Sequence, residues 1–147
     1  MSSAISFRLS NGVTIPGVGF GTYDKGGIKD EMYNAVLHAL RVGYRHLDCA
    51  WNYRNEDEIG RAIKDFLKEN PAVSREDLFI TTKVWVHLLA YDDVLWSINN
   101  SLENLQLDYV DLFLVHWPIA SEKEADYGIK FGPNGQVSET LPPTEQS

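Results

Sequence analysis

The chain has 147 residues, of which 44% are hydrophobic, and a formal net charge of −8 at pH 7. This length and apolar content predict one globular domain with a sizeable core. The acidic balance argues against a surface for nucleic acid or anionic membranes, because both need clustered Lys and Arg. Cys49 is the single cysteine, and the amino terminus lacks the pattern of a secretory signal, so we expect a cytoplasmic protein without internal disulfides.

The first two predicted strands form a hairpin. They cover residues 7–9 and 13–15, and the segment between them contains the pair Asn11 and Gly12, which strongly favours a tight hairpin turn. Pro16 follows the second strand and ends the pairing. The chain is therefore expected to open with a small antiparallel unit.

Residues 18–22 form the next predicted strand, which is rich in glycine. Gly17 and Gly19 fit the start of a G-x-G-x-x-G phosphate-binding pattern, but the position of the third glycine is Thr22. The residues that follow are typical of a loop, whereas that pattern requires a helix at once. We therefore interpret this segment as a tight strand that allows close backbone approach.

Two helices are predicted in the first half of the chain. One begins near Asp30 and ends at Gly43, a typical C-terminal glycine. The other begins at Asn55, where Glu58 stands three residues later in the pattern of a capping box. Each helix has apolar residues at helical spacing, which indicates one buried face.

A third helix begins at Asp92 and Asp93, and its expected buried face consists of Leu95, Ile98, Leu102 and Leu105. Each of the three helices is followed by a predicted strand, and these strands cover residues 44–49, 78–85 and 109–115. The last of these strands is nearly continuous in apolar residues, as expected for a strand covered on both faces.

Ionisable residues end three of these strands. Asp48, Lys83 and His116 stand 35 and 33 residues apart, which indicates a repeated strand–helix unit of nearly constant length. Crossovers between parallel strands are right-handed, so the carboxyl ends of the strands share one face. Tyr53 follows the first of these ends in a loop, and all four side chains are expected to converge. The sequence therefore predicts an α/β protein with its chemistry at this edge.

Each of these four residues also has an ordinary structural explanation. Asp48 could be a cap, Tyr53 a half-buried aromatic residue and Lys83 a surface charge, and His116 could belong to the core. Together, however, they form the set that acid catalysis by a phenol requires. A free phenol has a pKa of about 10 and donates its proton poorly near neutrality, unless a cation beside it favours the phenolate. Lys83 would supply that cation.

Two further groups would complete the set. Asp48 would hold the lysine in place. His116, if neutral, could donate a hydrogen bond to a carbonyl oxygen and orient it toward the phenol.

At these positions the sequence resembles the aldo-keto reductase family, over residues 7–118. The resemblance lies in the run GYRHLDCA at 43–50 with Glu56, Ile59 and Gly60 after it, in TTKVW at 81–85, and in LDYVDLFLVHWP at 107–118. The members that it resembles are of the aldose reductase and glycerol dehydrogenase type, which reduce small polyol aldehydes and ketones.

This resemblance implies a partial (β/α)8 TIM barrel with an N-terminal hairpin, about four parallel strands and three helices. It also implies NADPH-dependent reduction of aldehydes or ketones without a metal. The implied catalytic residues are Asp48, Tyr53, Lys83 and His116, with Tyr53 as the general acid. The implied cofactor-binding residues are Gly21, Thr22, Tyr23 and Asp48. The implied substrate-binding residues are Tyr23, Trp85, His116 and Trp117.

A complete barrel of this kind needs about 250 residues. We therefore expect residues 1–118 to form the N-terminal half of a barrel and residues 119–147 to form a loop and a polar, poorly ordered tail. Three hypotheses remain open: a truncated reductase, a half-barrel that associates with itself through its exposed face, and a non-catalytic binding module. The short-chain dehydrogenase class is excluded, because no tyrosine here has a lysine four residues later.

Overall fold

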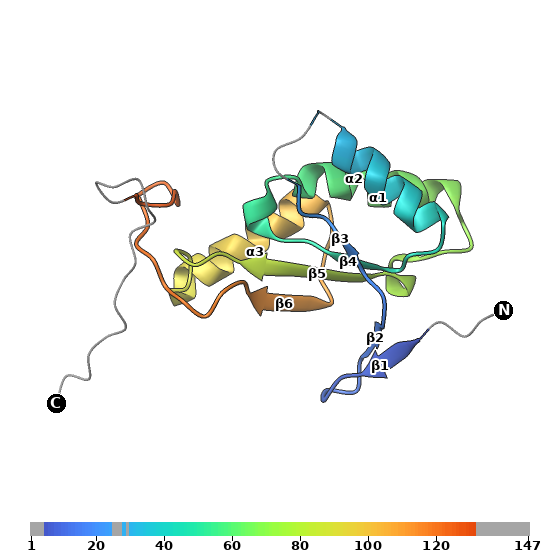
Figure 1. Cartoon of the computed structure of the whole chain (residues 1–147), viewed down its shortest axis with the longest axis horizontal. Coiled ribbons are helices and arrows are strands. Elements are labelled where there is room, and N and C mark those ends of the chain that lie inside the picture. Colours follow the sequence, from blue (N-terminus) through green and yellow to red (C-terminus); the bar gives the residue numbers. More distant parts are fainter. Residues whose placement is uncertain (1–4, 25–27, 29, 132–147) are drawn as a thin grey trace.

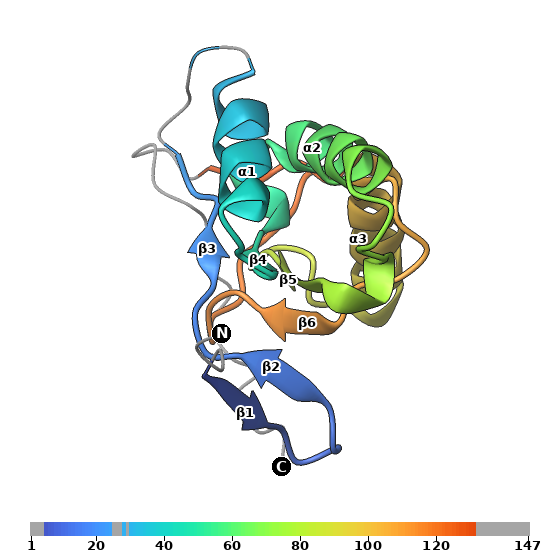
Figure 2. The same cartoon turned by 90° about the vertical axis from the view of Figure 1, so that its right-hand side faces the viewer.

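The computed structural model describes residues 5–24, 28 and 30–131. Strands β1 (Ser6–Arg8) and β2 (Thr14–Pro16) form an antiparallel hairpin. A parallel sheet follows in the order β3 (Phe20–Gly21), β4 (His46–Asp48), β5 (Phe79–Val84) and β6 (Leu112–Val115). Helices α1 (Glu31–Arg41), α2 (Glu56–Glu69) and α3 (Tyr91–Leu105) lie on the same side of this sheet (Figures 1 and 2). The hairpin, four parallel strands and three helices confirm the predicted architecture.

The main core lies between the helices and the sheet. Leu47 on β4 pairs in register with Ile80 on β5, and both side chains are fully buried. Val36 and Leu40 of α1 and Phe66 of α2 cover the same face. Complete burial of such a side chain stabilises a fold by about 1.5–3 kcal/mol. This core places the carboxyl ends of β4 and β5 side by side.

Helix α3 buries a different face from the one predicted. Leu105 is buried, but the side chain of Leu95 is 45% exposed. The buried row instead consists of Asp93, Ser97, Ser101 and Leu105, which follow one another at four-residue spacing. The reason is close helix packing: a Cβ at Gly60 of α2 would collide with the backbone of Leu105. Small side chains on α3 allow this approach.

The predicted capping box at the start of α2 is wrong. The side chain of Asn55 makes no capping bond, and its amide donates instead to the carbonyl of Thr22 at 2.8 Å. The carboxylate of Glu58 accepts hydrogen bonds from the backbone amides of Asp30 (3.2 Å) and Tyr33 (3.1 Å), at the start of α1. Asp30 makes no side-chain capping bond either. Glu58 therefore stabilises the neighbouring helix, because α1 and α2 pack against each other.

The segment after β6 contacts the end of the sheet and α3. The amide of Ser121 donates to the carbonyl of Val86 at 3.0 Å. The ring of Tyr127 stacks on that of Trp96, with centroids 4.0 Å apart and planes 5° from parallel. Residues 119–131 thus make defined contacts with α3 and with the loop that follows β5. Residues 132–147 lie outside the described residues.

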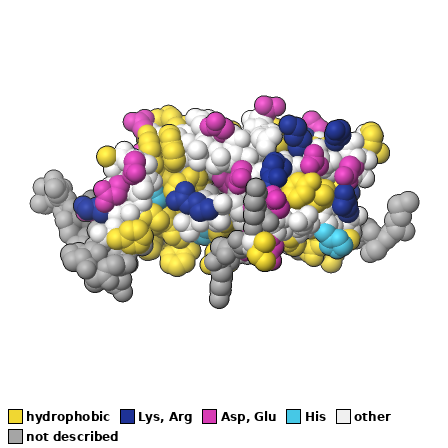
Figure 3. Space-filling view, turned by 90° about the horizontal axis from the view of Figure 1, so that it is seen from above, with side chains coloured by type: hydrophobic (Ala, Val, Ile, Leu, Met, Phe, Trp, Pro, Cys, Tyr) yellow, Lys and Arg dark blue, Asp and Glu magenta, His cyan; other side chains and the backbone are white. Residues whose placement is uncertain are grey.

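Charges of both signs alternate on the surface over the helices (Figure 3). Arg41 pairs with Glu69, and Arg61 pairs with Asp30. Within the described ranges, no helix is long and apolar enough to cross a membrane. In that same part of the chain, no group of three or more His, Cys, Asp or Glu side chains could hold a metal ion.

Candidate active site

The carboxyl ends of the central strands bring the predicted residues together. Register pairs Asp48 with Thr81, two residues before Lys83, and His116 follows the end of β6 directly. Tyr53 lies in a short 3₁₀ turn (Trp51–Tyr53) between β4 and α2. The four side chains therefore share one edge of the sheet, as their spacing predicts.

Lys83 is the centre of this group. Its Nζ donates to Asp48 Oδ1 at 2.6 Å, to the carbonyl of Cys49 at 2.9 Å and to Tyr53 Oη at 3.4 Å. An ammonium group has three donors, so these partners use all of them. The Tyr53 oxygen accepts from the lysine, so its own proton remains available to a further acceptor. A contact of 3.4 Å is long for a hydrogen bond, but catalytic contacts often shorten only when substrate is bound.

His116 lies edge-on to the ring of Tyr53, with centroids 5.5 Å apart, and to Trp85, at 4.7 Å. Burial lowers the pKa of this imidazole, and the charge of Lys83 lowers it further, while Asp48 acts in the opposite direction. The ring is therefore neutral at pH 7. Its buried Nδ1 has no hydrogen-bond partner among the described residues. A neutral imidazole beside the phenol can donate one hydrogen bond.

Aromatic rings form a continuous row of contacts through the site. Tyr23 meets Tyr53 edge-on at 5.2 Å, and Trp85 meets Trp117 at 5.9 Å, while His116 joins the two pairs. Tyr23 and Trp117 stand at the ends of the row, and their side chains are 63% and 53% exposed. The three aromatic residues predicted to line a substrate site thus lie in one row with Tyr53, in which Tyr23 contacts the phenol ring and His116 links that ring to Trp85.

The residues predicted to meet a cofactor differ in their accessibility. Gly21 pairs in register with Asp48, and a Cβ added there would meet no atom within 4 Å, so its backbone is open to close approach. Thr22 is fully buried, and both its amide and its hydroxyl donate to the carbonyl of Asp48 at 3.1 Å. Its own carbonyl accepts from Asn55. Thr22 therefore supports the backbone of Asp48.

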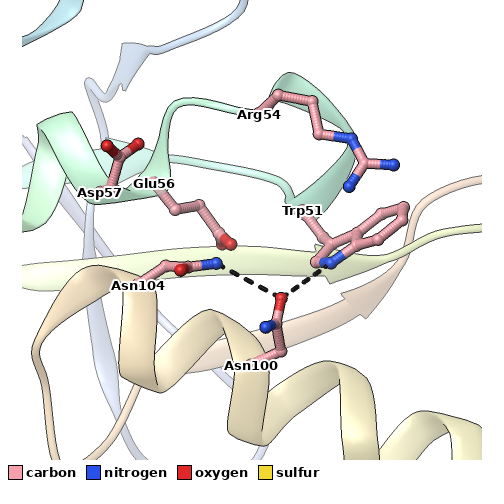
Figure 4. A pocket seen from close by; sticks show the side chains of 6 residues that line it. All are labelled: Trp51, Arg54, Glu56, Asp57, Asn100 and Asn104. Atoms are coloured by element: carbon pink, nitrogen blue, oxygen red, sulfur yellow. Dashed lines mark hydrogen bonds between the residues drawn. The ribbon is translucent and has the colours of Figure 1, made fainter. Parts of the chain in front are cut away.

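Several supporting residues were not predicted. Glu56, Asn100 and Asn104 lie behind the turn that carries Tyr53, as Figure 4 shows. Thr82 donates to the carboxylate of Glu56 at 2.6 Å. The sequence offers one indication of such residues, because polar side chains stand at positions where a helix or strand is expected to bury an apolar one. Their partners come from separate elements, so periodicity along one element does not identify them.

The sequence pattern of the aldo/keto reductase family matches residues 17–142. The chain belongs to this family. It is 60% identical over 131 residues to a glycerol 2-dehydrogenase (NADP(+)) of Hypocrea jecorina, a match that covers 89% of this chain and 41% of that protein. It is 42% identical to aldo-keto reductase family 1 member A1 of Xenopus tropicalis, over 96% of this chain and 42% of that protein.

Solved structures of other aldo/keto reductases share the fold. The aldose reductase of Schistosoma japonicum superposes with a TM-score of 0.85 at 38% identity, covering 95% of this chain and 45% of that one. A Bombyx mori aldo-keto reductase, solved in complex with NADP, superposes with a TM-score of 0.77 at 37% identity. This match covers 90% of this chain and 43% of that one. The expected partial (β/α)8 barrel is thereby confirmed. This aldo/keto reductase chain spans less than half the length of the relatives that it matches.

Proposed function

We propose that this chain supplies the proton-donating side of an NADPH-dependent reduction of small polyol aldehydes and ketones. The observation that carries the proposal is the contact of Lys83 with both Tyr53 and Asp48. A cation fixed beside a phenol makes the phenol a better acid, and general acid catalysis typically contributes about 10²- to 10⁴-fold.

In the proposed reaction, Tyr53 donates its proton to the carbonyl oxygen of the substrate. Lys83 stabilises the negative charge that develops on the phenolic oxygen, and Asp48 keeps the lysine in place. His116, neutral at pH 7, donates a hydrogen bond to the same carbonyl oxygen and so fixes its direction. The chain's own residues thus provide the acid, its activating cation and an orienting donor.

NADPH supplies the hydride when bound. Gly21 fits this cofactor because its open Cα lets a flat ring approach the backbone next to Asp48. Tyr23, exposed on the other side of the Tyr53 ring, would contact the cofactor and the substrate. NADP appears in the name of one relative and in the complex of a second.

We propose small substrates because aromatic rings stand next to the phenol on both sides and limit the space beside it. Trp85, Trp117 and Tyr23 offer apolar faces, and the hydroxyl groups of a short polyol can still reach solvent beyond the exposed ends of the row. A cytosolic location forms part of the same proposal and is supported by the single, fully buried cysteine, Cys49.

The test compares NADPH oxidation in the presence of glyceraldehyde by the parent and by Tyr53→Phe. Tyr91→Phe, on the exposed surface of α3, is the matched control. Both changes are also made in a chimera, in which the matching 131 residues of this chain replace those of the Hypocrea jecorina relative. We expect Tyr53→Phe to lose at least about 10²-fold in kcat with little change in NADPH affinity. Retention of more than about a tenth of kcat in the chimera excludes Tyr53 as the acid.

An interaction module is the second candidate. β6 is an edge strand of the described sheet, and its residues Leu114 and Val115 are exposed. Exposed edge strands and apolar patches are typical of surfaces that pair with another chain. Light scattering on the purified chain would give a dimer if this face drives self-association. A monomer that reduces carbonyls would favour the first candidate alone.

A further inference from the structure

A buried polar cluster lies behind the turn that carries Tyr53 (Figure 4). Its centre is the carboxylate of Glu56, in the first turn of α2, which is only 3% exposed. Glu56 accepts a hydrogen bond of 2.6 Å from the hydroxyl of Thr82, which is fully buried on β5. One short bond therefore joins the start of α2 to the middle of the sheet.

The position of this bond in the sequence is informative. Glu56 stands three residues after Tyr53, and Thr82 stands immediately before Lys83. Successive side chains of a strand point to opposite faces, so Thr82 faces the helices while Lys83 faces the site. Fixing the hydroxyl of Thr82 therefore fixes the strand from which Lys83 projects. The same bond fixes the first turn of α2, which the chain enters directly after the Tyr53 turn.

The other end of the turn is held by α3. The indole Nε1 of Trp51 donates to Asn100 Oδ1 at 3.0 Å, and Asn104 donates to the same oxygen at 3.3 Å. The guanidinium of Arg54 lies 3.6 Å above the ring of Trp51. Residues on both sides of Tyr53 are thus bound to the elements behind it.

A carboxyl group in this place is costly for the fold. Burial raises the pKa of Glu56, while the Thr82 hydroxyl, and less strongly Ser101, Arg54 and Asn104, favour the charged form. An apolar side chain of similar volume would often stabilise such a site as well or better. The polar cluster therefore needs an explanation other than stability.

We propose that Glu56 is a positioning residue, which through Thr82 sets the distance between the Tyr53 hydroxyl and the Lys83 ammonium. This inference rests on the proposed function, because the distance matters only if the phenol is the acid. A displacement of about 1 Å at reacting groups can cost about 10²-fold in rate. The cluster supplies a rigid support that a loop at the edge of a sheet would otherwise lack.

The experiment uses four variants of the whole chain. Thr82→Val keeps the shape and removes the donor, Glu56→Ala removes the acceptor, and Glu56→Gln keeps an acceptor oxygen. Asp57→Ala, at the exposed neighbouring position of α2, is the matched control. Amide hydrogen exchange is then measured at Tyr53, whose amide donates to the carbonyl of Ala50 at 3.0 Å. The amide of Phe79, in the core sheet, is the internal reference.

We expect Thr82→Val and Glu56→Ala to accelerate exchange at Tyr53 by about ten- to a hundredfold, with the Phe79 amide changed less than about threefold. Glu56→Gln should restore slow exchange, and Asp57→Ala should have no effect. If the cluster only stabilises the fold as a whole, exchange should accelerate equally at the amides of Tyr53 and Phe79. That pattern, or a change below about twofold at Tyr53, overturns the proposal.

A kinetic measurement separates this inference from the proposed function. We expect Thr82→Val to lower kcat by about tenfold or more without raising the KM for NADPH, and Glu56→Gln to recover most of the loss. A Thr82→Val variant with unchanged kcat overturns the positioning role, even if Tyr53→Phe is inactive. If Tyr53→Phe is active, the proposed function fails, whereas the exchange data still test whether the cluster holds the turn.

Discussion

The ammonium of Lys83 lies 3.4 Å from the hydroxyl of Tyr53, although the two residues are 30 positions apart in the chain. Lys83 belongs to strand β5, and Tyr53 belongs to the turn that follows β4. The lysine is almost completely enclosed by its partners, with 12% of its side chain exposed, while the Asp48 side chain remains 42% exposed. The pair therefore joins the phenolic oxygen to a cation that its other partners hold in place.

Replacement of the lysine should remove catalysis without unfolding the chain. Lys83→Met keeps the length of the side chain and removes the charge, so the proposed acid loses the cation that would stabilise the negative oxygen left after proton donation. We expect kcat in the chimera to fall by about 10²-fold or more. Lys64→Met, on the exposed face of α2, is the control and should leave kcat unchanged. A Lys83→Met variant with nearly parental kcat would contradict the proposed mechanism.

Acidification should destabilise the fold through one buried and two half-buried histidines. Burial is the main cause that lowers the pKa of His46, His87 and His116 below the ordinary value of 6.5. The unfolded chain then binds more protons than the folded chain as the pH falls. The stability that these histidines contribute is complete above pH 6.5 and is lost as the pH falls through their lowered pKa values. Urea unfolding at a series of pH values measures this loss.

A pair of histidine variants tests whether the buried His87 contributes to this loss of stability. His87→Gln keeps a donor for the carbonyl of Tyr127, which the His87 ring contacts at 2.7 Å, but it cannot titrate. This variant should lose less stability on acidification than the parent. His38→Gln, on the exposed face of α1, should have the parental dependence. Equal slopes for all three proteins would show that burial of His87 is not coupled to protonation.

Glu56 should give the fold a pH dependence of stability opposite to that of the histidines, because its contribution decreases as the pH rises. Burial raises its pKa, so the folded chain holds this proton more tightly than the unfolded chain. The resulting contribution to stability decreases as the pH rises from the ordinary value of 4.5 through the raised one. Glu56→Gln should remove this decrease, which pH-dependent urea unfolding would show as a flatter profile than that of the parent.

Two glycines should respond differently to the addition of one methyl group. Gly60→Ala places a Cβ against the backbone of Leu105, so the α2–α3 contact must open, and we expect a loss of about 1–3 kcal/mol in the free energy of unfolding. Gly21→Ala meets open space and should change stability by less than about 0.5 kcal/mol. In the chimera, Gly21→Ala should nevertheless weaken NADPH binding, as measured by fluorescence titration. Unchanged affinity would remove Gly21 from the proposed cofactor contacts.

The contacts of residues 119–131 predict a measurable stabilisation. Tyr127 stacks on Trp96, and Lys123 pairs with the buried carboxylate of Asp93. Tyr127→Ala should lower the free energy of unfolding by about 0.5–1.5 kcal/mol beyond the effect of lost apolar area. Phe131→Ala removes an aromatic ring that is largely exposed and serves as the control. If both variants melt at the parental temperature, this segment does not stabilise the domain.

Much of the site follows from local sequence patterns combined with one topological rule. Asp48, Lys83 and His116 each end a predicted strand, and right-handed crossovers require those ends to share one face. The short-range signals for the hairpin and the three helices are likewise strong, because turn and helix preferences depend on adjacent residues. Both the architecture and the convergence of these side chains could therefore be predicted.

Other features depend on which elements meet in space, and local patterns contain no information about that. Glu58 matches a capping box for its own helix, yet it binds the amides of α1, because the two helices lie together. The buried face of α3 is set by its close approach to Gly60, and the burial of Thr22 by its bonds to Asp48. The sequence by itself determined the order of the elements and the chemistry at the ends of the strands. Tertiary packing decided which polar group binds which, because a hydrogen bond forms wherever folding brings a donor and an acceptor together.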